Sequence, residues 1–120
     1  PLIGKVANVN WIEGSRNPDF TLNLGAALNQ ISEVKPALTF ITTPNNPTGT
    51  SITISEIEEL AKAAKSVSAL LVVDEAYAEF SSQPSAITLL DRYPNILISR
   101  TMSKAFAFAG ARVGYLAAEL

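Results

Sequence analysis

The amino-acid sequence predicts an α/β fold built on a doubly wound sheet with flanking helices. Two observations favour this class: short apolar runs that suit strands recur along the chain, and segments with helical spacing separate them. A third is the run at residues 69–73, which is apolar without alternation, as expected for a central parallel strand buried on both faces. Strands that alternate with helices in this way are joined by right-handed crossovers.

The first third of the chain contains two predicted strands and one predicted helix. Residues 5–12 alternate loosely between apolar and polar side chains and predict a short strand. Residues 22–34 place apolar side chains on one helical face, and Pro36 ends that helix. Residues 38–42 form a compact apolar run, which predicts a buried strand, and the loop at 44–49 follows it.

The clearest helix follows this loop. Its start is marked by a capping box, which pairs either Thr53 with Glu56 or Ser55 with Glu58. Helical spacing of apolar residues then continues to Val67, and Glu58 is placed to pair with a lysine one turn further on.

The last part of the chain continues the alternation of strands and helices. After the strand at 69–73, residues 86–93 predict a short helix that Pro94 ends. Residues 95–99 predict another strand, and residues 112–118 predict a final one after a stretch rich in alanine and phenylalanine.

Composition excludes several kinds of chemistry. The 120 residues include neither histidine nor cysteine, so serine–histidine–aspartate triads, cysteine–histidine pairs and the usual zinc sites cannot be built from them. Acid–base chemistry must therefore come from lysine, tyrosine or a carboxylate. A net charge of −2 without a basic run argues against nucleic-acid binding. The longest apolar run is too short to span a bilayer, so we expect a cytoplasmic protein. Because neither end of the sequence looks finished, we also expect a piece of a longer protein.

Polar residues follow three of the predicted strands. Residues 45–46 follow the strand at 38–42, residues 74–77 follow the next, and residues 101–104 follow the strand at 95–99. If these strands share one parallel sheet, the three clusters converge on one edge, where α/β sheets bind ligands. The clusters and the next strand together offer an amine, a carboxylate, a phenol, an amide, two hydroxyls and a guanidinium: Lys104, Asp74, Tyr77, Asn46, Thr101, Ser103 and Arg112.

A flat heteroaromatic phosphate that carries an aldehyde would use all of these groups. The lysine condenses with the aldehyde, and the buried carboxylate keeps the ring nitrogen protonated, so that the ring accepts electrons. Phenol and amide groups hold the ring oxygen, while hydroxyls and a guanidinium bind the phosphate.

The same residues resemble a known family. Residues 45–49 (Asn-Asn-Pro-Thr-Gly), 74–77 (Asp-Glu-Ala-Tyr) and 99–104 (Ser-Arg-Thr-Met-Ser-Lys), followed by Arg112, are similar to the motifs of fold-type-I pyridoxal-phosphate aminotransferases. Within that group, residues 74–80 and 103–114 look most like the histidinol-phosphate aminotransferases. The motifs occur in the family's order and approximate spacing over nearly the whole chain.

The resemblance implies a role for each candidate residue. Lys104 would form the Schiff base with pyridoxal 5'-phosphate and move the proton between substrate and cofactor. Asp74 would pair with the ring nitrogen, and Tyr77 and Asn46 would bind the ring oxygen. Three further side chains would bind the phosphate: Thr101, Ser103 and Arg112. No metal is implied.

The resemblance also implies the setting of this chain. Residues 1–120 would form the central part of the cofactor-binding large domain, with a mostly parallel sheet whose antiparallel strand is residues 112–118. The small substrate-binding domain would lie outside the chain, which alone would be incomplete for catalysis. The whole protein, a homodimer, would exchange an amino group between an amino donor and a 2-oxo acid. Histidinol phosphate and 2-oxoglutarate in histidine biosynthesis are the expected pair, and aromatic or aspartate aminotransferases of the same group are the alternative.

Two readings from other classes stay open at this point. Residues 70–76 also look like the magnesium-binding strand of a P-loop ATPase or helicase, but the phosphate-binding loop that this chemistry needs is missing. The chain could also be a folded module without activity. Considered alone, Lys104 is interpreted as a solvated lysine and Asp74 as a capping residue. Glu75 and Glu79 are interpreted as solvated or structural.

Overall fold

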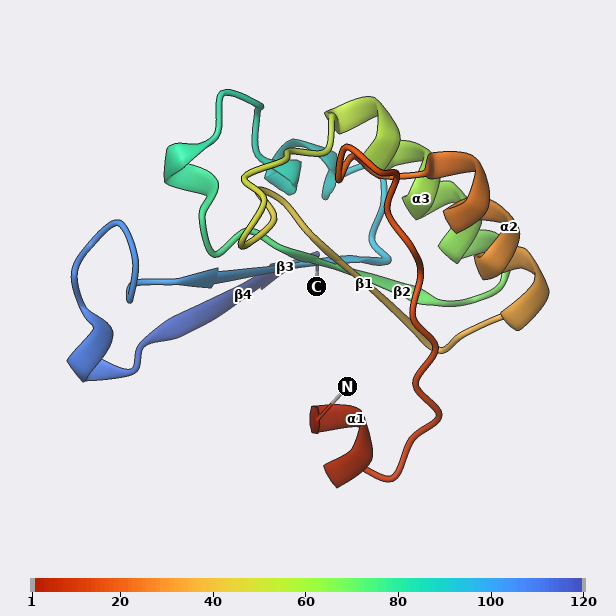
Figure 1. Cartoon of the computed structure of the whole chain (residues 1–120), viewed down its shortest axis with the longest axis horizontal. Helices are drawn as coiled ribbons and strands as arrows, with labels where there is room; N and C mark the ends of the chain where they lie inside the picture. The colour runs from red at the N-terminus through yellow and green to blue at the C-terminus, as the bar shows by residue number, and fades with distance from the viewer. Residues whose placement is uncertain (1, 120) are drawn as a thin grey trace.

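The structure is a computed structural model that describes residues 2–119 of the chain, with side chains described from residue 4 onward. Its centre is one four-stranded sheet, in which the strands lie side by side in chain order (Figure 1). The strands are β1 (Leu38–Thr42), β2 (Leu70–Asp74), β3 (Ile96–Thr101) and β4 (Gly114–Ala118). Strands β1, β2 and β3 are parallel, and β4 is antiparallel to β3. The predicted α/β class is confirmed, and so is the antiparallel last strand.

Two helices cover one face of this sheet. Helices α2 (Leu24–Val34) and α3 (Ile54–Ser66) lie against each other, and α3 packs on β2 (Figure 1). At the start of α2, the Asn23 side chain accepts a hydrogen bond from the backbone N–H of Ala26. Helix α3 begins with the first of the two predicted capping boxes, Thr53 with Glu56. These caps satisfy N–H groups that lack partners inside the helix.

The core lies between α3 and the sheet. Successive side chains of a strand point to opposite faces, so alternate residues of β2 and β3 point toward the helix. Those residues, together with the inner face of α3, are fully buried: Leu71, Val73, Ile96, Ile98, Ile57 and Leu60. On the opposite face, the side chains of Leu38, Phe40 and Leu70 are 48%, 55% and 40% exposed. The sheet therefore has a covered face and an open face.

The prediction of a strand at residues 5–12 is wrong. Helix α1 (Leu2–Val6) stands there, and a turn and irregular backbone follow it. Backbone N–H groups here bond locally, as from Val9 to the carbonyl of Gly4 (3.0 Å), instead of to a neighbouring strand. A strand needs such a neighbour, and a loose alternation of residue types does not supply one. The Trp11 ring instead lies 6.5 Å from that of Phe40, on the open face of β1.

The predicted helix at residues 86–93 is a shorter 3₁₀ helix, η2 (Ala86–Leu89), followed by turns. Its first N–H, that of Ala86, bonds to the Glu75 carboxylate outside the helix, and the helix ends at Leu89, before Pro94. Two further 3₁₀ turns, η1 (Ala78–Phe80) and η3 (Ala109–Ala111), were not predicted. None of the helices described is long and apolar enough to cross a membrane.

Candidate active site

The carboxyl ends of the three parallel strands are aligned. Thr42 of β1 pairs with Asp74 of β2, which in turn pairs with Ser99 of β3. The loops that follow these residues therefore leave the sheet at the same edge, as the sequence predicted. This edge is where open α/β sheets bind ligands.

Three of the candidate residues, each from a different loop, lie together at this edge. The Nδ2 of Asn46 donates a hydrogen bond to the Tyr77 hydroxyl (3.3 Å). The Nζ of Lys104 lies 5.3 Å from the centre of the Tyr77 ring, a distance at which a cation is attracted to the ring face. Because the Tyr77 oxygen accepts from Asn46, its own hydrogen stays free to be donated to a ligand.

Asp74 stands at the centre of this edge, on the middle strand of the parallel three. One of its carboxylate oxygens accepts a hydrogen bond from the backbone N–H of Ala76 (3.0 Å). In the described part of the chain no cation pairs with this carboxylate. By the alternation of the strand, its side chain belongs to the open face of the sheet. Asp74 is thus a half-buried carboxylate with an oxygen left for a ligand.

The candidate phosphate ligands are less closely grouped. The Thr101 hydroxyl accepts a hydrogen bond from the backbone N–H of Ser103 (3.1 Å) and donates one to the carbonyl of Val113 (3.4 Å). Arg112 is exposed, and its guanidinium donates to the carbonyl of Ala109 in its own loop (3.4 Å). Within residues 2–119, the structure does not bring Arg112 into contact with the other candidates.

The loop that carries Asn46 is held by a chain of side-chain hydrogen bonds that sequence reasoning missed. The Thr42 hydroxyl donates to Asn45 Oδ1, and Asn45 Nδ2 donates to the Thr48 hydroxyl, each at 2.8 Å. Gly49 closes the turn at a φ of 72°, which favours glycine. These bonds hold Asn46 in place opposite Tyr77.

An arginine from the N-terminal segment also fastens this loop. The guanidinium of Arg16 donates to the Thr50 hydroxyl (3.3 Å) and to the carbonyl of Thr42 (3.4 Å). Burial lowers the pKa of Arg16 from the ordinary arginine value, and its acceptors here are neutral oxygens. The turn-rich composition around Arg16 carried no signal for this contact, because the partners lie 26 and 34 residues away.

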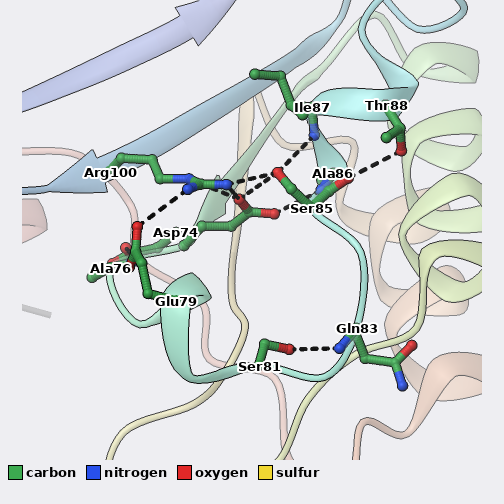
Figure 2. Close-up of polar contacts among 11 residues, drawn as sticks. Asp74, Ala76, Glu79, Ser81, Gln83, Ser85, Ala86, Ile87, Thr88 and Arg100 are labelled. Carbon is green, nitrogen blue, oxygen red and sulfur yellow. Dashed lines mark hydrogen bonds and ion pairs between the residues drawn. The ribbon is translucent and has the colours of Figure 1, made fainter. Parts of the chain in front are cut away.

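Glu75, which directly follows Asp74, is a buried carboxylate, only 2% exposed. Its carboxylate accepts hydrogen bonds from the Arg100 guanidinium (2.7 and 3.0 Å), from the Ser85 hydroxyl (2.8 Å) and from the backbone N–H of Ala86 (2.7 Å) (Figure 2). Arg100 also reaches Glu79 at 3.3 Å. Of the two interpretations given for Glu75, solvated or structural, the structure supports the second.

The pKa of Arg100 reflects this environment. Burial by itself lowers it, but the hydrogen bond and charge of Glu75, with smaller contributions from Tyr115 and Glu79, raise the pKa above the ordinary arginine value. A signal for the buried pair exists in the sequence. Glu75 continues the inward series of Leu71 and Val73, and Arg100 continues that of Ile96 and Ile98.

A hollow of about 250 Å³ lies beside the Asn46–Tyr77 contact, lined also by Phe80 and by the prolines that flank Asn46. Pockets that enclose small ligands usually measure roughly 300–1,000 Å³. The described residues thus supply one wall of a site. Among these residues no group of three carboxylates, histidines or cysteines is placed to bind a metal ion.

An α/β sheet whose carboxyl edge presents an amine, a carboxylate, a phenol and an amide defines a ligand-binding domain suited to a small cofactor. Comparison with known proteins identifies the family to which this domain belongs. The chain belongs to the aminotransferase class I and II family, whose sequence model matches residues 4–119.

Individual relatives agree with this assignment. The chain is 52% identical over 119 residues to the histidinol-phosphate aminotransferase of Nocardia farcinica, covering 98% of this chain and 30% of that protein. It is similar to the crystal structure of the histidinol-phosphate aminotransferase from Clostridium acetobutylicum, with a TM-score of 0.88 and 26% identity over 96% of this chain and 34% of that one. The enzyme of the same name from Sinorhizobium meliloti, solved in complex with pyridoxal-5'-phosphate, gives a TM-score of 0.79 and 30% identity over 92% and 30% of the two chains. The chain thus spans about a third of the length of these relatives.

Proposed function

We propose that residues 1–120 are the central part of the cofactor-binding large domain of a pyridoxal-phosphate-dependent aminotransferase. The observation that carries this proposal is the meeting of Asn46, Tyr77 and Lys104 at the edge of the sheet where Asp74 ends β2. Support comes from the family match and from a relative that was solved with pyridoxal-5'-phosphate bound. These residues form one site because the strands before them end at the same edge of the sheet.

The residues at this edge fit the cofactor. Lys104 is exposed with its amine 5.3 Å from the centre of the Tyr77 ring, the carboxylate of Asp74 has an unused oxygen, and the Tyr77 hydroxyl has a hydrogen to donate. The phosphate would be held by three side chains of the segment after β3: Thr101, Ser103 and Arg112. One Nη of Arg112 donates to the carbonyl of Ala109, and the other guanidinium N–H groups are left for a phosphate.

When bound, pyridoxal phosphate supplies an electron-withdrawing ring that stabilises negative charge on the substrate carbon. Asp74 would hold the proton on the ring nitrogen, because a carboxylate at this position favours the protonated ring. Tyr77 would donate a hydrogen bond to the ring oxygen while accepting one from Asn46. Lys104 would hold the cofactor through its aldehyde carbon and, as a free amine once the substrate amine has replaced it there, would carry a proton between the substrate carbon and the cofactor carbon.

For the whole protein we propose transfer of an amino group between histidinol phosphate and 2-oxoglutarate, in a cytoplasmic homodimer. The identity of about 50% to histidinol-phosphate aminotransferases supports this donor over the aromatic and aspartate alternatives. The small substrate-binding domain would be contributed by the rest of the protein. A P-loop ATPase is not proposed, because the family match covers the segment that suggested it.

The proposal is tested on the full-length protein with added pyridoxal phosphate. We expect a visible absorption band in the wild type and in Lys65→Ala, a control on the exposed side of α3, and none in Lys104→Ala. Rates with 2-oxoglutarate should be highest for histidinol phosphate in a panel that includes aromatic amino acids and aspartate. An unchanged band in Lys104→Ala would remove Lys104 as the residue that holds the cofactor, and the absence of a band in the wild type would remove the cofactor assignment. A higher rate with another donor would replace histidinol phosphate.

A further inference from the structure

A buried ion pair lies directly behind the proposed cofactor site. Glu75 and Arg100 are joined by two hydrogen bonds, and their side chains are 3% and 19% exposed. Figure 2 shows Arg100 reaching from β3 toward Glu79 of η1 and Ser85, the residue that caps η2. The pair thus links two strands and two 3₁₀ turns at one point.

The two faces of the sheet carry different residues at this point. Asp74 and Thr101 belong to the open face, whereas their chain neighbours Glu75 and Arg100 belong to the covered face, because side chains alternate along a strand. Each member of the ion pair is therefore joined by one peptide bond to a proposed cofactor contact. A change in the Glu75–Arg100 distance moves Asp74 relative to Thr101 and the loop that carries Lys104.

The ion pair continues the connection between β2 and β3 beyond their paired residues. The pairing of β2 with β3 ends at Asp74 and Ser99, and the backbone N–H of Glu75 still bonds to the carbonyl of Ser99 (2.9 Å). One residue further on, the side chains of Glu75 and Arg100 make the link. The turn that positions Tyr77 is held from the same residue, since the carbonyl of Glu75 accepts from the N–H of Ala78 (3.0 Å).

We propose that Glu75 and Arg100 are positioning residues that set the separation between Asp74 and the segment Thr101 to Lys104 for the cofactor. This inference rests on the proposed function, because it assigns the ion pair a role toward the cofactor of that site. The charged geometry suits such a role, because Nε and Nη2 of Arg100 both donate to one oxygen of Glu75 while its other oxygen accepts from the backbone N–H of Ala86, so the carboxylate is held from two sides. Removing Arg100 leaves the buried Glu75 carboxylate without its cation, whereas removing Glu75 leaves Arg100 paired only with Glu79.

The inference is tested by measuring cofactor binding in the full-length, cofactor-free protein with the variants Glu75→Gln, Arg100→Gln and Ser85→Ala. Ser85→Ala is the mild variant, since the Ser85 hydroxyl bridges both members of the pair. The matched control is Arg92→Gln, which breaks the exposed Arg92–Glu58 ion pair (3.1 Å) before the start of β3. Three quantities are measured: the Kd of pyridoxal phosphate, the visible absorption band of the bound cofactor, and the unfolding midpoint of the cofactor-free protein.

We expect the Kd of pyridoxal phosphate to rise about tenfold or more in the folded Glu75→Gln and Arg100→Gln proteins, the size of effect known when groups that orient metal-binding side chains are removed. Their absorption band should be weaker or displaced. The Kd should rise severalfold in Ser85→Ala and stay within about twofold of wild type in Arg92→Gln, whose ion pair is exposed.

The opposite pattern overturns the inference. If the folded variants unfold more easily but bind pyridoxal phosphate with the wild-type Kd and absorption band, the ion pair only stabilises the fold. If neither charge variant folds, an unchanged Kd in Ser85→Ala overturns the inference by itself. A wild-type protein that binds no pyridoxal phosphate would overturn the proposed function together with this inference, whereas normal binding by wild type and variants alike would overturn the inference alone.

Discussion

At the scale of single residues, Asp74 decides whether the proposed chemistry is possible. Its carboxylate ends the middle strand of the parallel three and keeps one oxygen free of hydrogen bonds in the described part of the chain. An aspartate that is already paired with a cation, or fully solvated, would stabilise the protonated cofactor ring much less. The position and environment of this residue therefore give a direct kinetic prediction.

We predict that Asp74→Ala and Asp74→Asn lower kcat of the full-length enzyme by about 10²-fold or more, the scale of loss when a group that stabilises developing charge is removed. The asparagine variant keeps the shape of the side chain but does not carry the charge that keeps the ring nitrogen protonated. Steady-state kinetics with histidinol phosphate would measure the effect. The matched control is Asp91→Asn, on an exposed turn. Normal kinetics for Asp74→Asn would contradict the pairing with the ring nitrogen.

Ala107, in the loop after Lys104, has a φ of 56°, in the left-handed region. A Cβ atom costs roughly 1–2 kcal/mol there, and glycine has none. We predict that Ala107→Gly raises the urea midpoint of the full-length protein, with a gain of about 0.5–1 kcal/mol after the greater freedom of glycine in the unfolded chain is offset. Ala105→Gly, in the same loop but outside the left-handed residues, should not be stabilising. Equal effects of the two substitutions would contradict the account of this loop.

The residue types in the site were predictable because the composition leaves few side chains that can do acid–base or covalent chemistry. Without histidine and cysteine, the reactive groups left at strand ends were Lys104, Asp74 and Tyr77. Glu75 and Arg100 escaped prediction because a buried ion pair needs the register of two strands, which the sequence of either strand alone does not specify. The placement of Arg112 on its own loop was also unpredictable, because it depends on a left-handed backbone at that residue.

At the scale of elements, α3 is joined to the segment before β3 by a cluster of charges around Glu58. The pKa of the Glu58 carboxyl is lowered, first by the hydrogen bond from the Tyr93 hydroxyl (2.7 Å) and then by the charges of Arg92 and Lys62. A carboxyl with a lowered pKa in the folded state stabilises the fold above its unfolded pKa. That contribution is lost as the pH falls through the folded pKa.

We predict that Tyr93→Phe lowers the thermal midpoint of the full-length protein at pH 7 and that the difference from wild type shrinks as the pH falls below about 4, the ordinary range of a glutamic acid. Glu58→Gln should show the same dependence, because it removes the same titrating group. Thermal unfolding at a series of pH values measures both. A Tyr93→Phe effect that stays constant from pH 7 to acid would show that the tyrosine acts by packing alone.

A helix or strand could be predicted where its local sequence pattern was clear and the element that it packs or pairs with was present. Helix α3 has a capping box and regular spacing, and it begins at the first of the two capping boxes that the sequence offered. The segment at 5–12 has a weak pattern and no strand beside it, so the expected strand is absent from the described residues. Residues 86–89 form a shorter 3₁₀ helix, whose first N–H, that of Ala86, bonds to the distant Glu75 carboxylate, a contact that no local pattern encodes.

At the scale of the whole molecule, the open face of the sheet carries exposed apolar side chains. Leu38, Phe40 and Leu70 are 48%, 55% and 40% exposed on this face. Exposed apolar surface of this kind marks an interaction surface. The mostly parallel sheet was predictable from the alternation of elements, but which face α2 and α3 would cover was not.

We predict that residues 1–120 produced alone bind a hydrophobic dye and associate with increasing concentration, whereas the full-length protein does neither. Phe40→Ser should reduce both effects in the isolated chain, because it removes the most exposed of the three apolar side chains on that face. Thr88→Ser, an exposed substitution on η2, serves as the control. Dye fluorescence and light scattering measure the outcome. An isolated chain that stays monomeric and binds no dye would contradict the open face.

The central claim is that Lys104 holds the cofactor at the carboxyl edge of this sheet. The most direct measurement is borohydride reduction of the full-length protein with pyridoxal phosphate, followed by mass analysis of its peptides. The account predicts that the added pyridoxyl group is found on Lys104. Its recovery on Lys5, Lys35, Lys62 or Lys65, or the absence of any labelled lysine, would contradict it.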